Sequence, residues 1–502
     1  MLTVATDVIV IGGGASGLMA AYAAAREGAG VMVLEKMPRP GRKIMITGKG
    51  RCNFTNVKPW DEFSRHIRSK ANFVRPAFYN LDPEAVLSFM EEHGVDVTVE
   101  RGDRAFPQSY KAAHIVDALV TAARREGADI LTDTEVETII KDPSGEGFLI
   151  SCRGGRTYSC LKLIIATGGL SYPGTGSTGD GYRWAKSLGH SVVDCFPSLT
   201  ALVPKGYKSK EECLSVGQIA AKVLDGGGRR FSVGPEMTNM ALPGEGYGKT
   251  KMRPSGVADD EEYGMTREAG KGKGSLPEGY PEPKGHIDRA LPLSDTGREL
   301  CGIHLKNVAL TLWVGNDKVQ TEIGELDFTD GGIEGPIGFA LSRSAVKALV
   351  NGGKVALSLD LKPGIPDNEL KDRILSLKED IRKDPRSRNA SKSALERVLL
   401  GKLLPRELVA PFLRANRGRD LAQALKDWRF EIEGYVGYER CVVTAGGVST
   451  DEVLPKTMES RLCKGLYFCG EVLDIDSDTG GYNLQTAFST GWLAGHSAAV
   501  SL

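Results

Sequence analysis

The feature that most constrains this sequence is a glycine-rich turn near its start, set between a buried strand and a helix. Residues 7–11 (DVIVI) form a short apolar run typical of a buried parallel strand. The turn Gly12-x-Gly14-x-x-Gly17 follows and leads into an alanine-rich stretch that predicts a helix. Residues 31–35 (VMVLE) predict a second strand that ends in an acid. This order is typical of the βαβ unit that opens a dinucleotide-binding fold.

Each glycine of the turn has its own physical task. The first allows the tight turn, the second lets the backbone approach a pyrophosphate, and the third lets the helix pack on the strand. The helix N-terminus offers N–H donors and positive potential to the phosphates. Glu35, 18 residues after Gly17, is placed to accept hydrogen bonds from ribose hydroxyls. An acid at this position disfavours a 2′-phosphate, so the site favours FAD or NAD over NADP.

Three further segments have the composition expected around FAD. Residues 166–169 (ATGG) follow an apolar strand whose end would pass the adenine and pyrophosphate half of the cofactor. Residues 470–474 precede two glycines and a helix whose dipole could stabilise the reduced flavin, with Asp474 accepting from a ribityl hydroxyl. The loop 41–53 is rich in glycine and cations, which suits either phosphate and flavin binding or a solvated surface loop. Cys52 has no resolving partner, so packing near the flavin is the expected role.

The pattern along the chain predicts an α/β fold in which both chain ends build one Rossmann-like FAD-binding domain, resembling that of glutathione reductase. A large insert with a β-barrel-like part and a helical part interrupts this domain. The predicted boundaries are 1–192 with 438–502 for the FAD-binding domain, 193–365 for the β-rich insert, and 366–437 for the helical subdomain. Residues 234–298 are rich in glycine, proline and charge, so we expect an irregular surface excursion there.

Composition narrows the class of protein. Lys and Arg together number 64, as do Asp and Glu, so the chain lacks the large basic field that steers a whole molecule to nucleic acid. No stretch is long and apolar enough to span a membrane, and the N-terminus carries no signal-peptide pattern, which predicts a cytoplasmic protein. Nine scattered cysteines fit reduced thiols, and the seven histidines share no metal-ligand spacing, so no metal site is predicted. The basic helical stretch 382–417 is expected to be a solvated face.

Six segments together resemble the bacterial FAD flavoproteins that include aminoacetone oxidase and the dehydro-bile-acid reductase. The segments are GGGASG, GRKIMITGKGRCNFTN, ATGGLSYPGTGSTGDGY, FTDGGIEGP, VTAGGVSTDEVLPKTMES and GLYFCGEVLDIDSDTGGYNLQTAFSTGWLAG. The resemblance extends from Asp7 to Gly495 and implies the same discontinuous FAD domain and insert. The excursion 234–298 is longer than the family's usual connection, and Ser477 stands where the family often has glycine, which bears on loop conformation more than on chemistry.

The motifs and the resemblance together give a set of residues expected along the FAD. They are Gly12, Gly14, Ala15, Ser16, Gly17, Glu35, Lys36, Arg42, Lys43, Thr47, Gly50, Arg51, Cys52, Asn53, Val136, Ala166, Thr167, Gly168, Gly169, Gly470, Glu471, Asp474, Gly481, Tyr482, Asn483 and Leu484.

The expected chemistry is hydride transfer through flavin N5, for which two reactions remain open. One is reduction of a conjugated C=C bond in a small organic substrate, with NAD(P)H as electron donor; the other is oxidation of a small amine by O₂. No second strand-GxGxxG-helix unit is present, so a nicotinamide would have to reach the flavin by way of the insert, or be absent. Arg51 and Tyr172 are candidates for polarising the substrate. A non-catalytic flavoprotein with an RNA or protein partner is the alternative from another class, and the neutral net charge argues against RNA.

Overall fold

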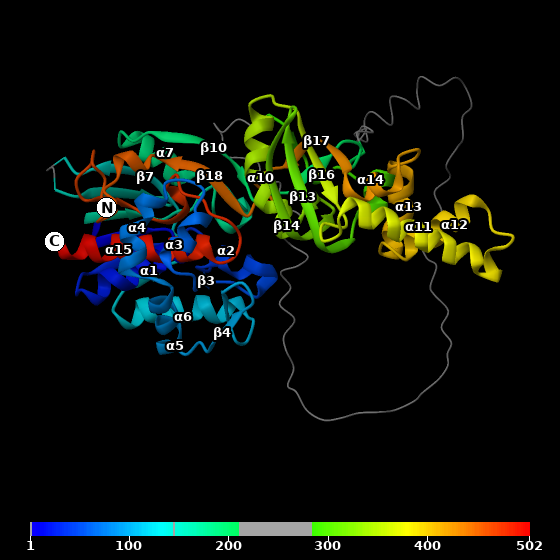
Figure 1. The fold of residues 1–502 in the computed structure, drawn as a ribbon. Coiled ribbons are helices and arrows are strands. Elements are labelled where there is room, and N and C mark those ends of the chain that lie inside the picture. The colour runs from blue at the N-terminus through cyan, green and yellow to red at the C-terminus, as the bar shows by residue number, and fades with distance from the viewer. Residues whose placement is uncertain (1–2, 144–145, 210–283) are drawn as a thin grey trace, which may run out of the picture. The chain divides into compact units, whose positions relative to one another are not determined.

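The first layer of the fold is a seven-stranded sheet. The structure is a computed structural model that describes residues 3–143, 146–209 and 284–502. The strand order is β6-β2-β1-β9-β8-β7, and β19 also pairs with β9. Figure 1 marks both chain ends, N and C, in this part of the molecule. β1, β2, β6, β9 and β19 run parallel, whereas β7 and β8 are antiparallel. The strands are β1 (Thr3–Ile11), β2 (Val31–Leu34), β6 (Asp129–Leu131), β7 (Val136–Lys141), β8 (Phe148–Cys152), β9 (Thr157–Ile165) and β19 (Leu466–Phe468).

Both ends of the chain contribute to this layer. The glycine-rich turn joins β1 to α1 (Ala15–Arg26), and α1 packs along the last helix, α15 (Tyr482–Val500). The two helices approach closely, because a Cβ on Gly495 would lie 2.1 Å from the carbonyl oxygen of Ala20. Only glycine is small enough for that position. The discontinuous Rossmann-like fold predicted from the sequence is therefore confirmed.

A second sheet closes on itself. β11 pairs with both β15 and β17, so the order β11-β15-β14-β13-β16-β17 returns to its start as a six-stranded barrel, and β12 adds to β17. Helix α10 (Gly335–Val350) packs on β14. The strands are β11 (Leu202–Pro204), β12 (His286–Ile287), β13 (His304–Val314), β14 (Asp317–Thr329), β15 (Gly332–Glu334), β16 (Val355–Asp360) and β17 (Trp428–Val436).

Buried hydrophobic side chains form two clusters. One runs from Val8 to Ala185 and from Tyr438 to Ala499, and fills the space around the first sheet. The other runs from Ala201 to Val436 and joins the barrel to the helices that follow it. Those helices are α11 (Asp367–Lys383), α12 (Lys392–Gly401), α13 (Arg406–Ala415) and α14 (Leu421–Lys426). Among the described residues, no helix has the length and apolarity needed to cross a bilayer.

Smaller elements surround the first sheet. They are α2 (Arg42–Ile46), α3 (Trp60–Phe63), α4 (Ala71–Asn80), α5 (Pro83–Glu92), α6 (Ala112–Arg125), α7 (Asp180–Ser187), the three-stranded sheet of β3 (Thr55–Asn56), β4 (Val97–Glu100) and β5 (Arg104–Pro107), and the pair β10 (Val192–Ser198) and β18 (Val443–Val448). The eight cysteines in the described ranges are free thiols.

The structure differs from the predicted elements in three places. Residues 366–437 were predicted to be helical, but the helices end at Lys426 and β17 belongs to the barrel. Its first six residues, WRFEIE, alternate buried and more exposed positions, which is the strand period. The predicted irregular excursion 234–298 is wrong at its end, where β12 and α9 (Asp295–Leu300) form; its part up to residue 283 lies outside the described residues. Helix α10 was not predicted.

Candidate functional site

The turn between β1 and α1 is shaped so that one of its sides stays open. Gly12 has φ +105°, and a Cβ there would lie 2.6 Å from the carbonyl oxygen of Ala166. A Cβ on Gly17 would lie 1.9 Å from the carbonyl oxygen of Gly12. A Cβ on Gly14, by contrast, would meet no described atom within 4 Å. Gly14 is also the N-cap of α1 and no side chain caps it, so the first N–H groups of the helix remain available to an anion.

Glu35 lies beside this turn at the end of β2. Its carboxylate accepts from the backbone N–H of Gly13 at 2.7 Å and from that of Met37 at 2.8 Å. Burial raises the pKa of Glu35, although these two hydrogen bonds oppose the rise. Each carboxylate oxygen retains a free lone pair, so the group can also accept from a diol. The neighbouring Lys36 pairs with Asp180 of α7 at 2.7 Å.

Several buried side-chain oxygens have no hydrogen-bond partner among the described residues, and two of them belong to residues expected along FAD. One is Thr167 Oγ1, in the loop after β9, and the other is Asn53 Oδ1. Asn53 Oδ1 lies 2.9 Å from the place a Cβ would take on Gly481, the N-cap of α15. Buried polar atoms are nearly always paired in folded proteins. Asn53 Oδ1 therefore fits a polar ligand at the N-terminus of α15, whereas Thr167 Oγ1 faces α7, 2.2 Å from the place a Cβ would take on Gly181.

The basic loop 41–53 is tied to distant parts of the chain. Lys43 Nζ contacts Glu471 Oε2 at 2.6 Å and Ser171 Oγ at 2.8 Å. Glu471 also accepts from Ser171 Oγ at 2.7 Å and from the backbone N–H of Thr444 at 2.8 Å. Burial opposes ionisation of Glu471, but Lys43 and the hydrogen bonds hold its pKa below the usual range. This network joins α2, the loop after β9 and the loop after β19.

The other predicted residues of the loop 41–53 take no part in this network. Thr47 Oγ1 donates to the carbonyl oxygen of Lys43 at 3.0 Å, and Arg42 and Gly50 are partly exposed. Cys52 is fully buried with φ +56°, and burial raises the pKa of its thiol to about 12, so it is a neutral packing group. Arg51 pairs with Glu100 at 2.6 Å and lies over the rings of Phe106 and Tyr110.

The loop between β19 and α15 is held by hydrogen bonds within itself. Asn483 accepts from the backbone N–H of Ser477 and donates to the carbonyl oxygens of Ser477 and Asp478. The backbone N–H of Gly470 donates to Thr490 Oγ1 at 3.0 Å.

The other predicted residues of this region and of the first sheet have the following surroundings. Burial raises the pKa of Asp474. Tyr482 stacks on His66 with 4.2 Å between ring centroids. Leu484 packs at the edge of the first hydrophobic cluster, Val136 is buried in β7, and Ala166, Gly168 and Gly169 follow β9.

Tyr172 lies in the loop that follows Gly169. Its backbone is left-handed, with φ +51°, and its N–H donates to the carbonyl oxygen of Tyr438 at 2.9 Å. Burial raises the pKa of the Tyr172 phenol, and the charges of Arg440 and Glu334 act on it from the neighbouring segment. Arg440 itself forms an ion pair with Glu334 at 2.7 Å. Tyr172 is therefore a partly buried phenol beside charged groups, whereas Arg51 is engaged in a surface pair.

The ion pair between Arg343 and Asp476 could not be predicted from the sequence. The carboxylate of Asp476 is fully buried and accepts from Arg343 of α10 at 2.6 and 3.1 Å. Ser69 Oγ and Ser198 Oγ each donate to it at 3.1 Å. Arg343 and Asp476 are 133 residues apart, so spacing could not have revealed the pair. Asp476 itself stands in the DIDSDTGG segment that the sequence did single out.

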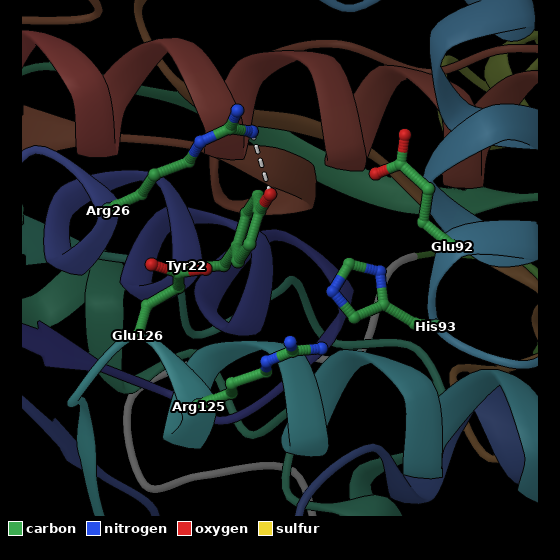
Figure 2. A pocket seen from close by; sticks show the side chains of 6 residues that line it. All are labelled: Tyr22, Arg26, Glu92, His93, Arg125 and Glu126. Atoms are coloured by element: carbon green, nitrogen blue, oxygen red, sulfur yellow. Dashed lines mark hydrogen bonds between the residues drawn. The ribbon is translucent and has the colours of Figure 1, made fainter.

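A surface pocket lies at the other end of α1 (Figure 2). Its volume is about 240 Å³, and it is lined by Tyr22, Arg26, Glu92, His93, Arg125 and Glu126. Arg26 donates to the Tyr22 hydroxyl at 2.8 Å. The pocket is formed by the C-terminal ends of α1, α5 and α6, where helix dipoles disfavour anions. Among the described residues, no three His, Cys, Asp or Glu side chains are grouped to hold a metal.

Comparison with known proteins gives consistent matches over the whole chain. A family model described as the HI0933-like protein Rossmann domain matches residues 6–497. The 3-dehydro-bile acid delta(4,6)-reductase of Clostridium scindens is 29% identical over 501 residues, with 98% of each chain covered. The ribosomal RNA dihydrouridine synthase of Escherichia coli is 27% identical over 499 residues, with 97% of this chain and 96% of that protein covered. The protein of the same description from Haemophilus influenzae is 27% identical over 501 residues, with 97% of each covered.

Proposed function

Because this chain belongs to the HI0933-like family of Rossmann flavoproteins, we propose that it binds FAD non-covalently and reduces a C=C bond conjugated to a carbonyl group. The observations that carry the cofactor assignment are the open side of Gly14 at the uncapped N-terminus of α1 and the buried, partnerless Asn53 Oδ1 beside Gly481. The similar proteins support the reaction. A 3-dehydro bile acid with a Δ4 double bond and a uridine ring both contain a C=C bond conjugated to a carbonyl.

We assign contacts along the whole length of FAD to residues around the two glycine turns. The open side of Gly14 and the N–H groups of α1 would bind the pyrophosphate, and Glu35 would accept from the adenosine ribose. Thr167 would donate near the pyrophosphate, and Asp474 would bind the ribityl chain. The N-terminus of α15 would place positive potential beside the pyrimidine edge of the flavin. FAD, when bound, supplies hydride transfer through N5.

Reduction of a conjugated C=C bond also requires a proton at the carbon next to the carbonyl. We assign its delivery to Tyr172, because burial keeps this phenol protonated at neutral pH. The hydrogen bond from its N–H to Tyr438 fixes the loop that carries it. Arg51 is the other candidate, but its guanidinium is held by Glu100, so we propose that it stabilises the loop 41–53.

We propose NAD(P)H as the electron donor and a small organic molecule as the acceptor. The sequence holds one strand-GxGxxG-helix unit, so the nicotinamide would approach the flavin directly. Oxidation of a small amine by O₂ is the rival reaction, and no observation on the described residues favours it.

The test is steady-state NADPH oxidation by the FAD-loaded protein with an α,β-unsaturated ketone, compared with the saturated ketone as a matched control. We expect turnover with the unsaturated ketone only. Tyr172→Phe should lower kcat by about 10²–10⁴-fold while FAD absorbance stays unchanged. Turnover of a primary amine with O₂, and none with the enone, would contradict the proposal.

A further inference from the structure

The loop between β19 and α15 carries three aspartates at alternate positions, Asp474, Asp476 and Asp478. Asp478 pairs with His66 and Arg68, and Asp476 has the ion pair to α10 described above. Asp474 forms no ion pair with any residue in the described parts of the chain. Two of the three carboxylates therefore hold the loop in place, and the third is available to a ligand.

Asp476 lies where helix α10 of the insert meets this loop. The guanidinium of Arg343 contacts both of its carboxylate oxygens, at 2.6 and 3.1 Å. Such a two-pronged contact fixes orientation as well as distance. Ile337 and Leu341 of α10 belong to the second hydrophobic cluster, whereas Ile475, next to Asp476, belongs to the first. The pair therefore joins the two clusters at the loop that is assigned to FAD.

The position of Asp474 depends on that of Asp476, because the two are tied to the same neighbours. Ser69 Oγ lies 3.1 Å from Asp476 Oδ1 and 3.4 Å from the carbonyl oxygen of Asp474. The N–H of Asp474 donates to the carbonyl oxygen of Val448 at 2.9 Å, and the carbonyl oxygen of Asp476 accepts from the N–H of Arg68 at 2.8 Å. A shift of the Asp476 carboxylate would therefore move the backbone that carries Asp474.

The charge of Arg343 also acts on Asp474. Burial raises the pKa of Asp474, and the negative charge of Asp476 adds to this rise. Lys70 and Arg343 oppose it. Arg343 therefore favours the ionised carboxylate, which is the form that accepts hydrogen bonds from hydroxyl groups with both oxygens.

We propose that Arg343 is a positioning residue for the cofactor, because through Asp476 it holds the loop from which Asp474 meets the ribityl chain. FAD binding and the attachment of α10 to the loop are therefore coupled. This inference rests on the proposed FAD site. Coupling of this kind is reciprocal, so whatever factor the ion pair contributes to FAD affinity, bound FAD contributes to the ion pair.

The test is a flavin fluorescence titration of the full-length, FAD-free protein with FAD, at a temperature well below the melting temperature of every variant. Arg343→Gln should raise the Kd for FAD by about 5- to 150-fold, the usual range of such coupling. Arg343→Lys keeps the charge and loses the two-pronged contact, so a smaller rise is expected. The Lys variant also serves as the test if Arg343→Gln fails to fold.

A matched control separates positioning from a general loss of stability. Lys426 lies in the helical part of the insert and pairs with Asp360 at 2.7 Å. Its side chain is 18% exposed, close to the 23% of Arg343. Lys426→Gln therefore removes a similarly buried cation that has no link to the FAD loop. It should lower the stability of the insert and change the Kd for FAD by less than about twofold.

Hydrogen exchange gives a second measurement that a purely structural ion pair would not affect. FAD should slow exchange in α10 of the unsubstituted protein and of Lys426→Gln, but not in Arg343→Gln.

Three results would overturn the inference alone. They are an unchanged Kd for FAD in Arg343→Gln, an equal rise of that Kd in Lys426→Gln, and exchange in α10 of the unsubstituted protein that FAD leaves unchanged. An unsubstituted protein that binds no FAD would contradict both this inference and the proposed function.

Discussion

At the scale of single residues, one glycine of the turn between β1 and α1 is needed for folding and another for cofactor binding. A Cβ on Gly17 would lie 1.9 Å from a carbonyl oxygen, whereas a Cβ on Gly14 would meet no described atom within 4 Å. Gly17→Ala should therefore destabilise the FAD-free protein by about 1–3 kcal/mol. Gly14→Ala should leave the melting temperature of that FAD-free protein nearly unchanged and weaken FAD binding at least about tenfold, which is about 1.4 kcal/mol. Equal effects of the two variants on both quantities would contradict the assignment of Gly14 to the pyrophosphate.

The buried carboxylate of Asp476 makes a second prediction at this scale. Arg343→Gln leaves that carboxylate without its cation, which should lower the free energy of unfolding by about 3–5 kcal/mol. The double variant Arg343→Gln, Asp476→Asn should recover part of the loss, because the uncompensated charge is gone. Urea unfolding of both variants measures this. A double variant less stable than Arg343→Gln alone would show that the charge pairing is not what matters.

At the scale of elements, Glu471 connects α2, the loop after β9 and β18. Its lowered pKa means that its ionised form stabilises the fold above the unfolded pKa, near 4.3, and that this stability is lost as pH falls through the folded pKa. Lys43→Met should therefore reduce stability by about 1–3 kcal/mol at pH 7, and the difference from wild type should shrink below about pH 4. Urea unfolding across this pH range measures it, with Lys186→Met as the control. A difference that stays constant with pH would contradict the pairing.

The elements also show what a sequence can predict here. β1, α1 and β2 were predicted correctly because each segment has a single hydrophobic periodicity. A glycine-rich turn also marks the boundary between β1 and α1. β17 was missed because one residue, Asp427, separates it from the last of four consecutive helices, although its own alternation was readable. β9 has different partners along its length, because β8 pairs with residues 157–160 and β19 with residues 163–165.

The candidate site was predictable only in part. The glycines, Glu35 and the loop after β19 belong to motifs whose residues lie close together in the sequence. The pair Lys43–Glu471 joins residues 428 positions apart, and the partnerless oxygens of Thr167 and Asn53 are visible only once the chain is folded. Such features form only through tertiary packing, so no periodicity in the sequence indicates them.

At the scale of the whole molecule, two hydrophobic clusters imply that FAD will stabilise one part of the chain more than the other. Every residue assigned to FAD lies in segments of the first cluster. At 100 times its Kd, FAD should add about 2.7 kcal/mol to the stability of that part. Hydrogen exchange with and without FAD should therefore show slower exchange in β1, α1 and α15, and little change in α11–α14. Protection that is uniform over both clusters would show that they unfold as one unit.

We propose that this chain is a flavoprotein that passes electrons from a nicotinamide to a conjugated C=C bond. The most direct test is an anaerobic titration of the FAD-loaded protein with NADPH or NADH, followed by an α,β-unsaturated ketone, while the visible flavin absorbance is recorded. We expect one nucleotide to bleach the flavin and the ketone to restore its colour without air. A flavin that neither nucleotide bleaches, or whose colour returns only when air is admitted, would contradict it.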